Sequence, residues 1–219
     1  MFNNLDATNF SGSIPFYDVN FENILSKITI CYYKMIENKE PLFKDENKIR
    51  DVLVNDYLNN PKIKKELKLE YFINPEVPEK NNKRPDIKFQ SPNTFYNPEQ
   101  YYSIECKVLN NENLTGKTGL NAKYVENGIY RFTSNYYSSF YRVNAMIGFI
   151  IEKLDTHKNI ENINVILQSN NAINTTKEIT SSSFIEDFKY HYHSEHLDES
   201  NQKLRIYHLM LDFSENMPS

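Results

Sequence analysis

Apolar residues recur every three or four positions in two stretches near the start of the chain, which is the spacing of helices with one buried face. The first stretch covers residues 14–40 and stops at Pro41, and the second begins at Asp45 and stops before Pro61. Aspartate is a favourable N-cap and proline cannot continue a helix, so these boundaries have a physical cause. The pattern therefore predicts two helices before the first strand.

The spacing then changes to that of short extended segments. Three runs are rich in β-branched and aromatic residues and are bounded by Pro, Asn and Lys: LKLEYFI at 67–73, RPDIKF at 84–89 and YYSIECKV at 101–108. This composition is typical of strands. The close succession of the three runs predicts a three-stranded meander.

The rest of the chain alternates between the two patterns. Helical spacing returns at 119–133, the unbroken apolar run 145–151 indicates a buried strand, and a weaker helical pattern covers about 156–172. Two strand-like segments around the polar turn DESNQ then predict a β-hairpin within 184–213. Together these elements predict an α/β fold in which helices flank a central mixed β-sheet, with an N-terminal helix and a C-terminal β-hairpin.

Length and composition favour one folded domain covering 1–219. A chain of 219 residues can bury a core without disulfides or a structural metal, and the sequence shows no repeat or long linker. Within it we expect a core at about 45–151, an N-terminal helical extension at 1–44 and the hairpin at 184–213. The 39% hydrophobic and 25% charged composition, with 16 Tyr and 14 Phe, argues against disorder.

Charge and cysteine content narrow the functional classes. The net charge of -4 argues against a protein that coats nucleic acid nonspecifically, but it permits an enzyme with a small substrate groove. Basic residues do gather between positions 62 and 88. Cys31 and Cys106 have neither zinc nor redox spacing, and no leader or membrane-spanning run is visible, so we expect a cytoplasmic protein in a reducing compartment.

Charged side chains stand on two strands of the predicted meander. Side chains alternate between faces, so Glu105 and Lys107 share one face of the third strand while Cys106 lies on the opposite, apolar face. The same alternation separates Asp86 from the apolar Ile87. If the two strands pair as neighbours, Asp86 and Glu105 converge on one sheet face, and the backbone carbonyl of Cys106 lies between them.

This set of groups suits a hard divalent cation and a phosphate. Carboxylates and backbone carbonyls are ligands for Mg²⁺ or Mn²⁺. Phosphodiester hydrolysis needs a cation that offsets phosphate charge and activates water, and a nearby ammonium can orient that water. We therefore expect Asp86, Glu105 and Lys107 to be catalytic, and Asp86, Glu105 and the Cys106 carbonyl to bind the metal.

The motif formed by Pro85-Asp86, a spacer and Glu105-Cys106-Lys107 resembles the PD-(D/E)XK nuclease superfamily, which has the restriction-endonuclease-like fold. The predicted order of helix, three strands, helix and strand over 45–151 resembles the core of that superfamily. The runs YVENGIYRF, AMIGFI, SEHL and YHLMLDF look similar to small bacterial nucleases from mobile or defence-associated loci. The resemblance implies a Mg²⁺-dependent endonuclease whose substrate is double-stranded DNA.

The resemblance also implies further site residues. The family often carries an acid on the helix before the sheet, and Glu46 takes that place as a metal ligand, directly or through water. The alternative for Glu46 is a solvated carboxylate favoured by the helix N-terminus. Tyr124 and Arg131, on the helix after the meander, and Lys88 are candidates for nucleic-acid contact. The alternative for Tyr124 and Arg131 is a buried tyrosine and a surface arginine.

The sequence also permits other functions. A noncatalytic nucleic-acid-binding or assembly subunit would keep this fold and use the basic region 62–88. Because no recognition domain is visible, we expect specificity to come from a homodimer partner or a further subunit. Gly116-Lys117-Thr118 lacks the glycine that a phosphate loop needs at position 111, and predicts no nucleotide site. A transition-metal site is possible at four histidines, although such hairpin residues more often make ordinary hydrogen bonds: His191, His193, His196 and His208.

Overall fold

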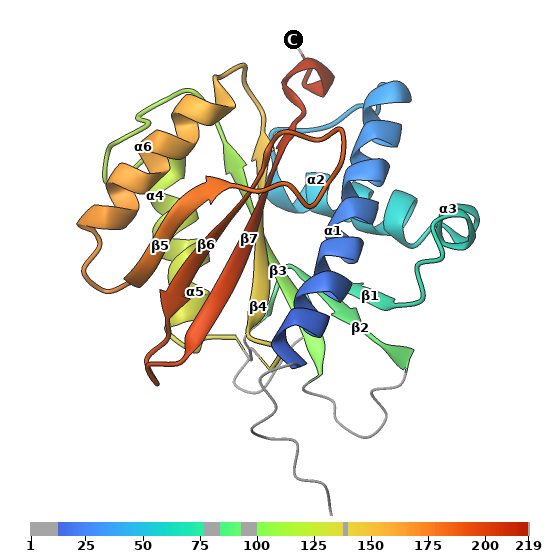
Figure 1. Ribbon diagram of the computed structural model, residues 1–219. Coiled ribbons are helices and arrows are strands. Elements are labelled where there is room, and N and C mark those ends of the chain that lie inside the picture. The colour runs from blue at the N-terminus through green and yellow to red at the C-terminus, as the bar shows by residue number, and fades with distance from the viewer. Residues whose placement is uncertain (1–12, 77–83, 93–99, 138–139, 219) are drawn as a thin grey trace, which may run out of the picture.

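The computed structural model describes residues 13–76, 84–92, 100–137 and 140–218. It is an α/β protein built on a seven-stranded mixed sheet with the strand order β1-β2-β3-β4-β7-β6-β5 (Figure 1). The strands are β1 (Phe72–Pro75), β2 (Ile87–Gln90), β3 (Tyr101–Leu109), β4 (Val143–Ile150), β5 (Asn174–Ser181), β6 (His191–Leu197) and β7 (Lys203–Asp212).

Helices cover both faces of this sheet. The long helix α1 runs along one face, and α4 and α6 lie across the other (Figure 1). Two helical stretches widen into π-helical turns, η1 and η4, each continuous with its neighbouring α-helix. The helical elements are α1 (Ser13–Glu37), α2 (Glu46–Asp51), η1 (Val52–Leu58), α3 (Pro61–Glu66), α4 (Leu120–Tyr124), η4 (Val125–Ile129), α5 (Tyr130–Thr133), α6 (Thr156–Ser169) and the 3₁₀ turn η5 (Ser214–Asn216).

Two hydrophobic clusters pack on the opposite faces of the sheet. The first joins α1 and η1 to the strands, with Leu25 and Leu53 buried against inward residues such as Ile147. The second joins η4 and α6 to the other face and includes Ile129 and Ile163. All eight residues of β4 are buried, as expected for a strand that is covered on both faces.

Antiparallel and parallel pairing divide the sheet into regions. The strands β1, β2 and β3 form the antiparallel meander predicted from the sequence, while β4 is parallel to both β3 and β7. The strands β7, β6 and β5 are again antiparallel, and β6 with β7 forms the predicted C-terminal hairpin.

The pairing of β2 with β3 ends early, and this creates an opening in the sheet. Ile87 opposite Ile104 is the last pair, whereas β3 continues alongside β4 as far as Leu109. Beyond Ile104, no strand in the described part of the chain pairs with the edge of β3 that faces β2.

Most of the expected elements are confirmed, but one strand begins later than predicted, and two further elements, α3 and β5, were not predicted. The strand predicted at 67–73 begins instead at Phe72, because the additional helix α3 occupies Pro61–Glu66 and the chain turns at Lys68 with φ 49°. The side chain of Asn60 caps α3, so the proline that ends one helix also begins the next. The strand β5 was not predicted, because seven of its eight residues lie wholly or partly exposed and form no apolar alternation.

The two outer strands of the sheet are irregular. On one side, β1 has four residues and ends in Pro75, which has no N–H to donate. On the other side, β5 pairs with β6 through two register shifts, between Thr175 and Lys177 and between Lys177 and Thr180. In the described part of the chain, no helix has both the length and the apolar character needed to cross a membrane.

Candidate active site

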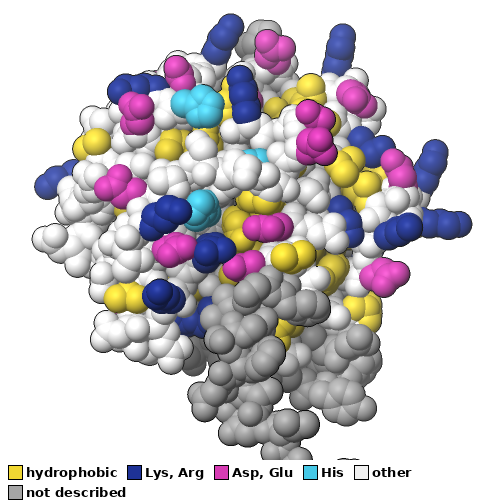
Figure 2. All heavy atoms as spheres, viewed as in Figure 1, with side chains coloured by type: hydrophobic (Ala, Val, Ile, Leu, Met, Phe, Trp, Pro, Cys, Tyr) yellow, Lys and Arg dark blue, Asp and Glu magenta, His cyan; other side chains and the backbone are white. Residues whose placement is uncertain are grey.

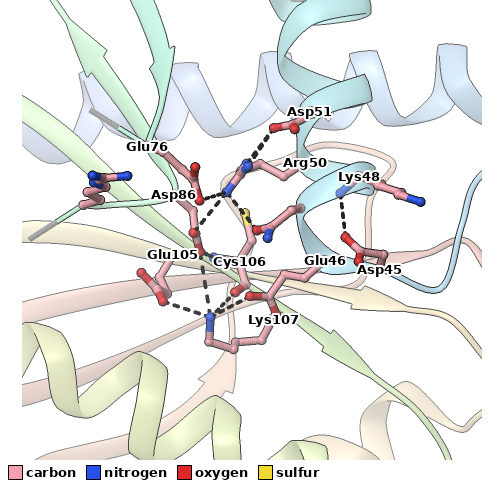
Figure 3. Close-up of polar contacts among 12 residues, drawn as sticks. Asp45, Glu46, Lys48, Arg50, Asp51, Glu76, Asp86, Glu105, Cys106 and Lys107 are labelled. Carbon is pink, nitrogen blue, oxygen red and sulfur yellow. Dashed lines mark hydrogen bonds and ion pairs between the residues drawn. The ribbon is translucent and has the colours of Figure 1, made fainter. Parts of the chain in front are cut away.

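Two carboxylates take the place of the missing strand along the open edge of β3. The Cys106 N–H donates to Asp86 Oδ2 at 2.7 Å, and the Val108 N–H donates to Glu46 Oε2 at 3.1 Å (Figure 3). The N–H and C=O of one strand residue point to the same side, so the Cys106 carbonyl also opens to this edge. The early divergence of β2 thus gathers Asp86, Glu46 and the Cys106 carbonyl at one place.

The ammonium of Lys107 lies at the centre of this group (Figure 3). Its Nζ is 2.9 Å from Glu105 Oε1, 3.0 Å from Glu46 Oε1 and 3.8 Å from Asp86 Oδ2. It also donates to the Cys106 carbonyl oxygen. Three acids and one carbonyl therefore converge on the position of a single positive charge.

Glu105 is fully buried, and both of its carboxylate oxygens have partners. Oε1 accepts from Lys107 and from Arg131 Nη1, and Oε2 lies 2.8 Å from the Tyr137 hydroxyl. The Cys106 side chain points to the other face of the sheet, into the cluster that packs against α1. The alternation of faces along β3 is therefore as predicted.

Burial and charge shift the pKa values of Glu105 and Lys107 upward. Burial raises the pKa of Glu105 to about 7, and the nearby Asp86 charge adds to this, while Lys107 and Arg131 oppose it. Burial alone would lower the pKa of Lys107, but the charges of Glu105, Asp86 and Glu46 raise it above its usual value. Lys107 is therefore held as an ammonium.

Arg50, on α2, contacts the Asp86 carboxylate. Its side chain is 3% exposed, and Nη1 lies 3.4 Å from Asp86 Oδ1 and 3.2 Å from Glu76 Oε1. It also bonds Asp51, while the Glu76 N–H donates to the Asp86 carbonyl. Arg50 was not singled out from the sequence, although it lies one helical turn after Glu46 and so projects from the same side of α2.

The donor set suits a hard cation. Asp86, Glu105 and the Cys106 carbonyl offer oxygen atoms, and the Lys107 ammonium marks where a positive charge is stabilised. Among the described residues, however, no group of three or more His, Cys, Asp or Glu side chains is arranged to hold a metal ion. Glu46 lies beside these donors, with Oε1 3.0 Å from Lys107 Nζ.

The remaining predicted site residues separate into two groups. Arg131 reaches the site, because it bonds Glu105 while its side chain stays 35% exposed. Tyr124 is wrongly assigned as a nucleic-acid contact, since its side chain is fully buried and its hydroxyl is 2.9 Å from His208 Nδ1. Lys88 is largely buried with its Nζ 3.8 Å from the centre of the Tyr101 ring, and so offers little surface to a ligand.

The histidines of the hairpin take part in hydrogen bonds. Ser194 Oγ lies 2.8 Å from His208 Nε2 and 2.7 Å from His196 Nε2, which continues the chain of contacts from Tyr124. His191 Nε2 contacts the Ser182 carbonyl oxygen, and His193 contacts Ser182 Oγ and Lys177. Within the described residues these side chains form no metal cluster.

Surface charge on the face opposite α4 and α5 is mixed. Figure 2 shows Lys and Arg side chains interspersed with Asp and Glu there, with no single basic patch. The mixture of charges on this face agrees with the net charge of -4.

Comparisons with known proteins return no match. The chain matches no protein-family model, no curated protein and no solved structure. A function therefore has to be inferred from the chemistry of these residues.

Proposed function

We propose that the protein is a metal-dependent nuclease that hydrolyses phosphodiester bonds, with double-stranded DNA as its substrate. The observation that carries this proposal is the convergence of Asp86, Glu105 and the Cys106 carbonyl on the Lys107 ammonium, at the open edge of β3. A binding module has no need of buried acids that converge where phosphate charge would have to approach.

Each group has a chemical task in this proposal. Asp86, Glu105 and the Cys106 carbonyl would hold Mg²⁺ or Mn²⁺, which offsets charge on the phosphate and lowers the pKa of a bound water. Lys107, held as an ammonium, orients the attacking water and stabilises charge in the transition state. Glu46 anchors α2 to the Val108 N–H and assists the metal through water.

The arrangement of elements supports membership of the PD-(D/E)XK superfamily. The helical stretch α2–η1 precedes the antiparallel meander β1-β2-β3, a second helical stretch follows, and β4 returns parallel to β3. Asp86 immediately precedes the middle strand of that meander, and Glu105 and Lys107 lie on the third strand. We further propose a cytoplasmic enzyme of bacterial defence, in which a homodimer partner or another subunit supplies specificity.

Nicking of supercoiled plasmid tests the proposal. With Mg²⁺ or Mn²⁺ the protein should cut, and Asp86→Asn and Glu105→Gln should abolish cutting, because each removes a charged ligand and keeps the shape of the side chain. Asp56→Asn and Glu126→Gln are matched controls, since these carboxylates are exposed on η1 and η4, and they should cut like the parent.

Failure to cut under any divalent metal would overturn the nuclease proposal. If the protein still bound the plasmid, the noncatalytic binding or assembly subunit would be the better description. If it bound no nucleic acid, the cluster at β3 would be a structural ion network.

A further inference from the structure

The hydroxyl of Tyr137 joins three separate parts of the chain beside the candidate site. Its Oη lies 2.8 Å from Glu105 Oε2, 3.0 Å from the carbonyl oxygen of Arg84 and 3.1 Å from Arg131 Nη1. Arg84 lies two residues before Asp86, so this one hydroxyl links the strand that carries Glu105 to the segment that carries Asp86.

The local backbone directs Tyr137 to this position. Helix α5 ends where Asn135 adopts a left-handed conformation with φ 51°, and the Tyr136 N–H donates back to the Arg131 carbonyl. The turn brings the Tyr137 ring against Phe132, with ring centroids 5.5 Å apart. The path of this turn cannot be read from helical periodicity, which explains why the sequence did not indicate Tyr137.

Tyr137 is a buried hydrogen-bond donor. The residue is 2% exposed, and burial, reinforced by the charge of Glu105, raises the pKa of its hydroxyl above the usual range. The hydroxyl therefore keeps its proton at neutral pH. It can accept from the Arg131 guanidinium and donate to Glu105 or to the Arg84 carbonyl.

We propose that Tyr137 is a positioning residue for the metal site, which fixes Glu105 relative to Asp86 without touching the metal. The inference rests on the proposed nuclease function. The Tyr137 hydroxyl contacts Oε2 of Glu105, while Oε1 points to the Lys107 ammonium. The carboxylate of Asp86 and the carbonyl of Cys106 converge on the same ammonium. With the hydroxyl removed, Glu105 can turn, and the segment before Asp86 loses its tie to β3.

Removal of a group that orients a metal ligand typically lowers metal affinity or activity by about 10- to 100-fold. Tyr137→Phe removes only the hydroxyl and keeps the ring packing. Calorimetric titration with Mn²⁺ should then give a Kd raised by roughly tenfold or more relative to the parent. Tyr130→Phe is the matched control, because it makes the same change on an exposed tyrosine of α5 and should leave the Kd unchanged.

The titration includes the parent and Glu105→Gln, so that two failures can be told apart. A parent that binds no Mn²⁺ would overturn the proposed function and this inference with it. A parent that binds Mn²⁺, a Glu105→Gln that does not, and a Tyr137→Phe that binds like the parent would overturn the inference alone.

A second measurement covers the case in which Tyr137→Phe does not fold. With 3-fluorotyrosine placed at position 137, the ¹⁹F resonance should shift as Mg²⁺ is added and should not shift in the Glu105→Gln background. A resonance that does not shift when Mg²⁺ is added to the otherwise unchanged protein would show that Tyr137 has only a packing role.

Discussion

Single residues at the open edge of β3 have two tasks each. Asp86 and Glu46 satisfy backbone N–H groups that would otherwise lie buried without a partner, and both also lie near the Lys107 ammonium. The same carboxylates thus stabilise the end of the sheet and create the charged site. Substitutions of Asp86 therefore have to keep its shape if effects on chemistry are to be separated from effects on folding.

Lys107 offers a sharp test at the residue scale. Lys107→Ala should leave Mn²⁺ binding in place and lower the rate of plasmid cleavage by about a hundredfold, in line with the loss of one electrostatic stabiliser. Lys107→Arg should also cut poorly, because a planar guanidinium does not replace a compact ammonium in a tight site. Single-turnover cleavage at saturating metal measures both, and parent-like rates in the two variants would contradict the assigned role.

Alternation along strands was sufficient to predict which charged residues meet. Asp86, Glu105 and Lys107 share a face because β2 and β3 pair as neighbours, and both facts follow from local sequence pattern. Arg50 and Tyr137 could not be predicted in the same way. Their contacts depend on how α2 packs against the sheet and on one left-handed turn, and neither leaves a periodic signal in the sequence.

At the scale of elements, α2 is the support for one side of the site. This helix has six residues, carries Glu46 and Arg50, and begins at Asp45, whose side chain accepts from the Lys48 N–H. Helix α6 begins in the same manner, since the Asp155 side chain accepts from the Lys158 N–H, but no candidate site residue lies on α6.

The two caps make a matched pair of variants. Asp45→Ala and Asp155→Ala should each lower the free energy of unfolding by about 1 kcal/mol, because each removes an N-cap. Plasmid cleavage should fall in Asp45→Ala only, since only α2 positions Glu46 and Arg50. Urea unfolding and nicking assays measure the two effects. Equal activity in both variants would show that α2 does not position the site.

The reliability of the predicted elements followed the amount of apolar surface that each element buries. The helix at Ser13–Glu37 and the central strand β4 bury many apolar residues, and both were predicted from clear patterns. Strand β5 and helix α3 bury almost nothing, so their hydrophobic pattern is absent. Pairing with β6 and capping by Asn60 define those two elements instead.

At the scale of the whole molecule, buried histidines link stability to pH. Burial lowers the pKa of His196 to about 4 and that of His208 well below its usual value, so both take up a proton less readily in the folded chain than in the unfolded chain. The unfolded chain binds a proton at each of them below about pH 6.5, and the folded chain does not. Their contribution to stability is therefore lost as the pH falls below that value.

His208→Gln should isolate this effect. Between pH 7 and pH 5, the difference in unfolding free energy between the parent and the variant should narrow, because only the parent gains a proton at position 208 on unfolding. Urea titrations at several pH values provide the measurement. If the difference in unfolding free energy stays constant with pH, His208 has the same pKa in the folded and unfolded chains, which would contradict this prediction.

The irregular outer strands bear on how copies of the protein behave when they are crowded together. Growth of fibres requires a long, regular strand onto which the next chain can add. Here one outer strand has four residues, the last of which is a proline, and the other pairs with its neighbour through two register shifts. The folded molecule is consequently a poor seed for such growth.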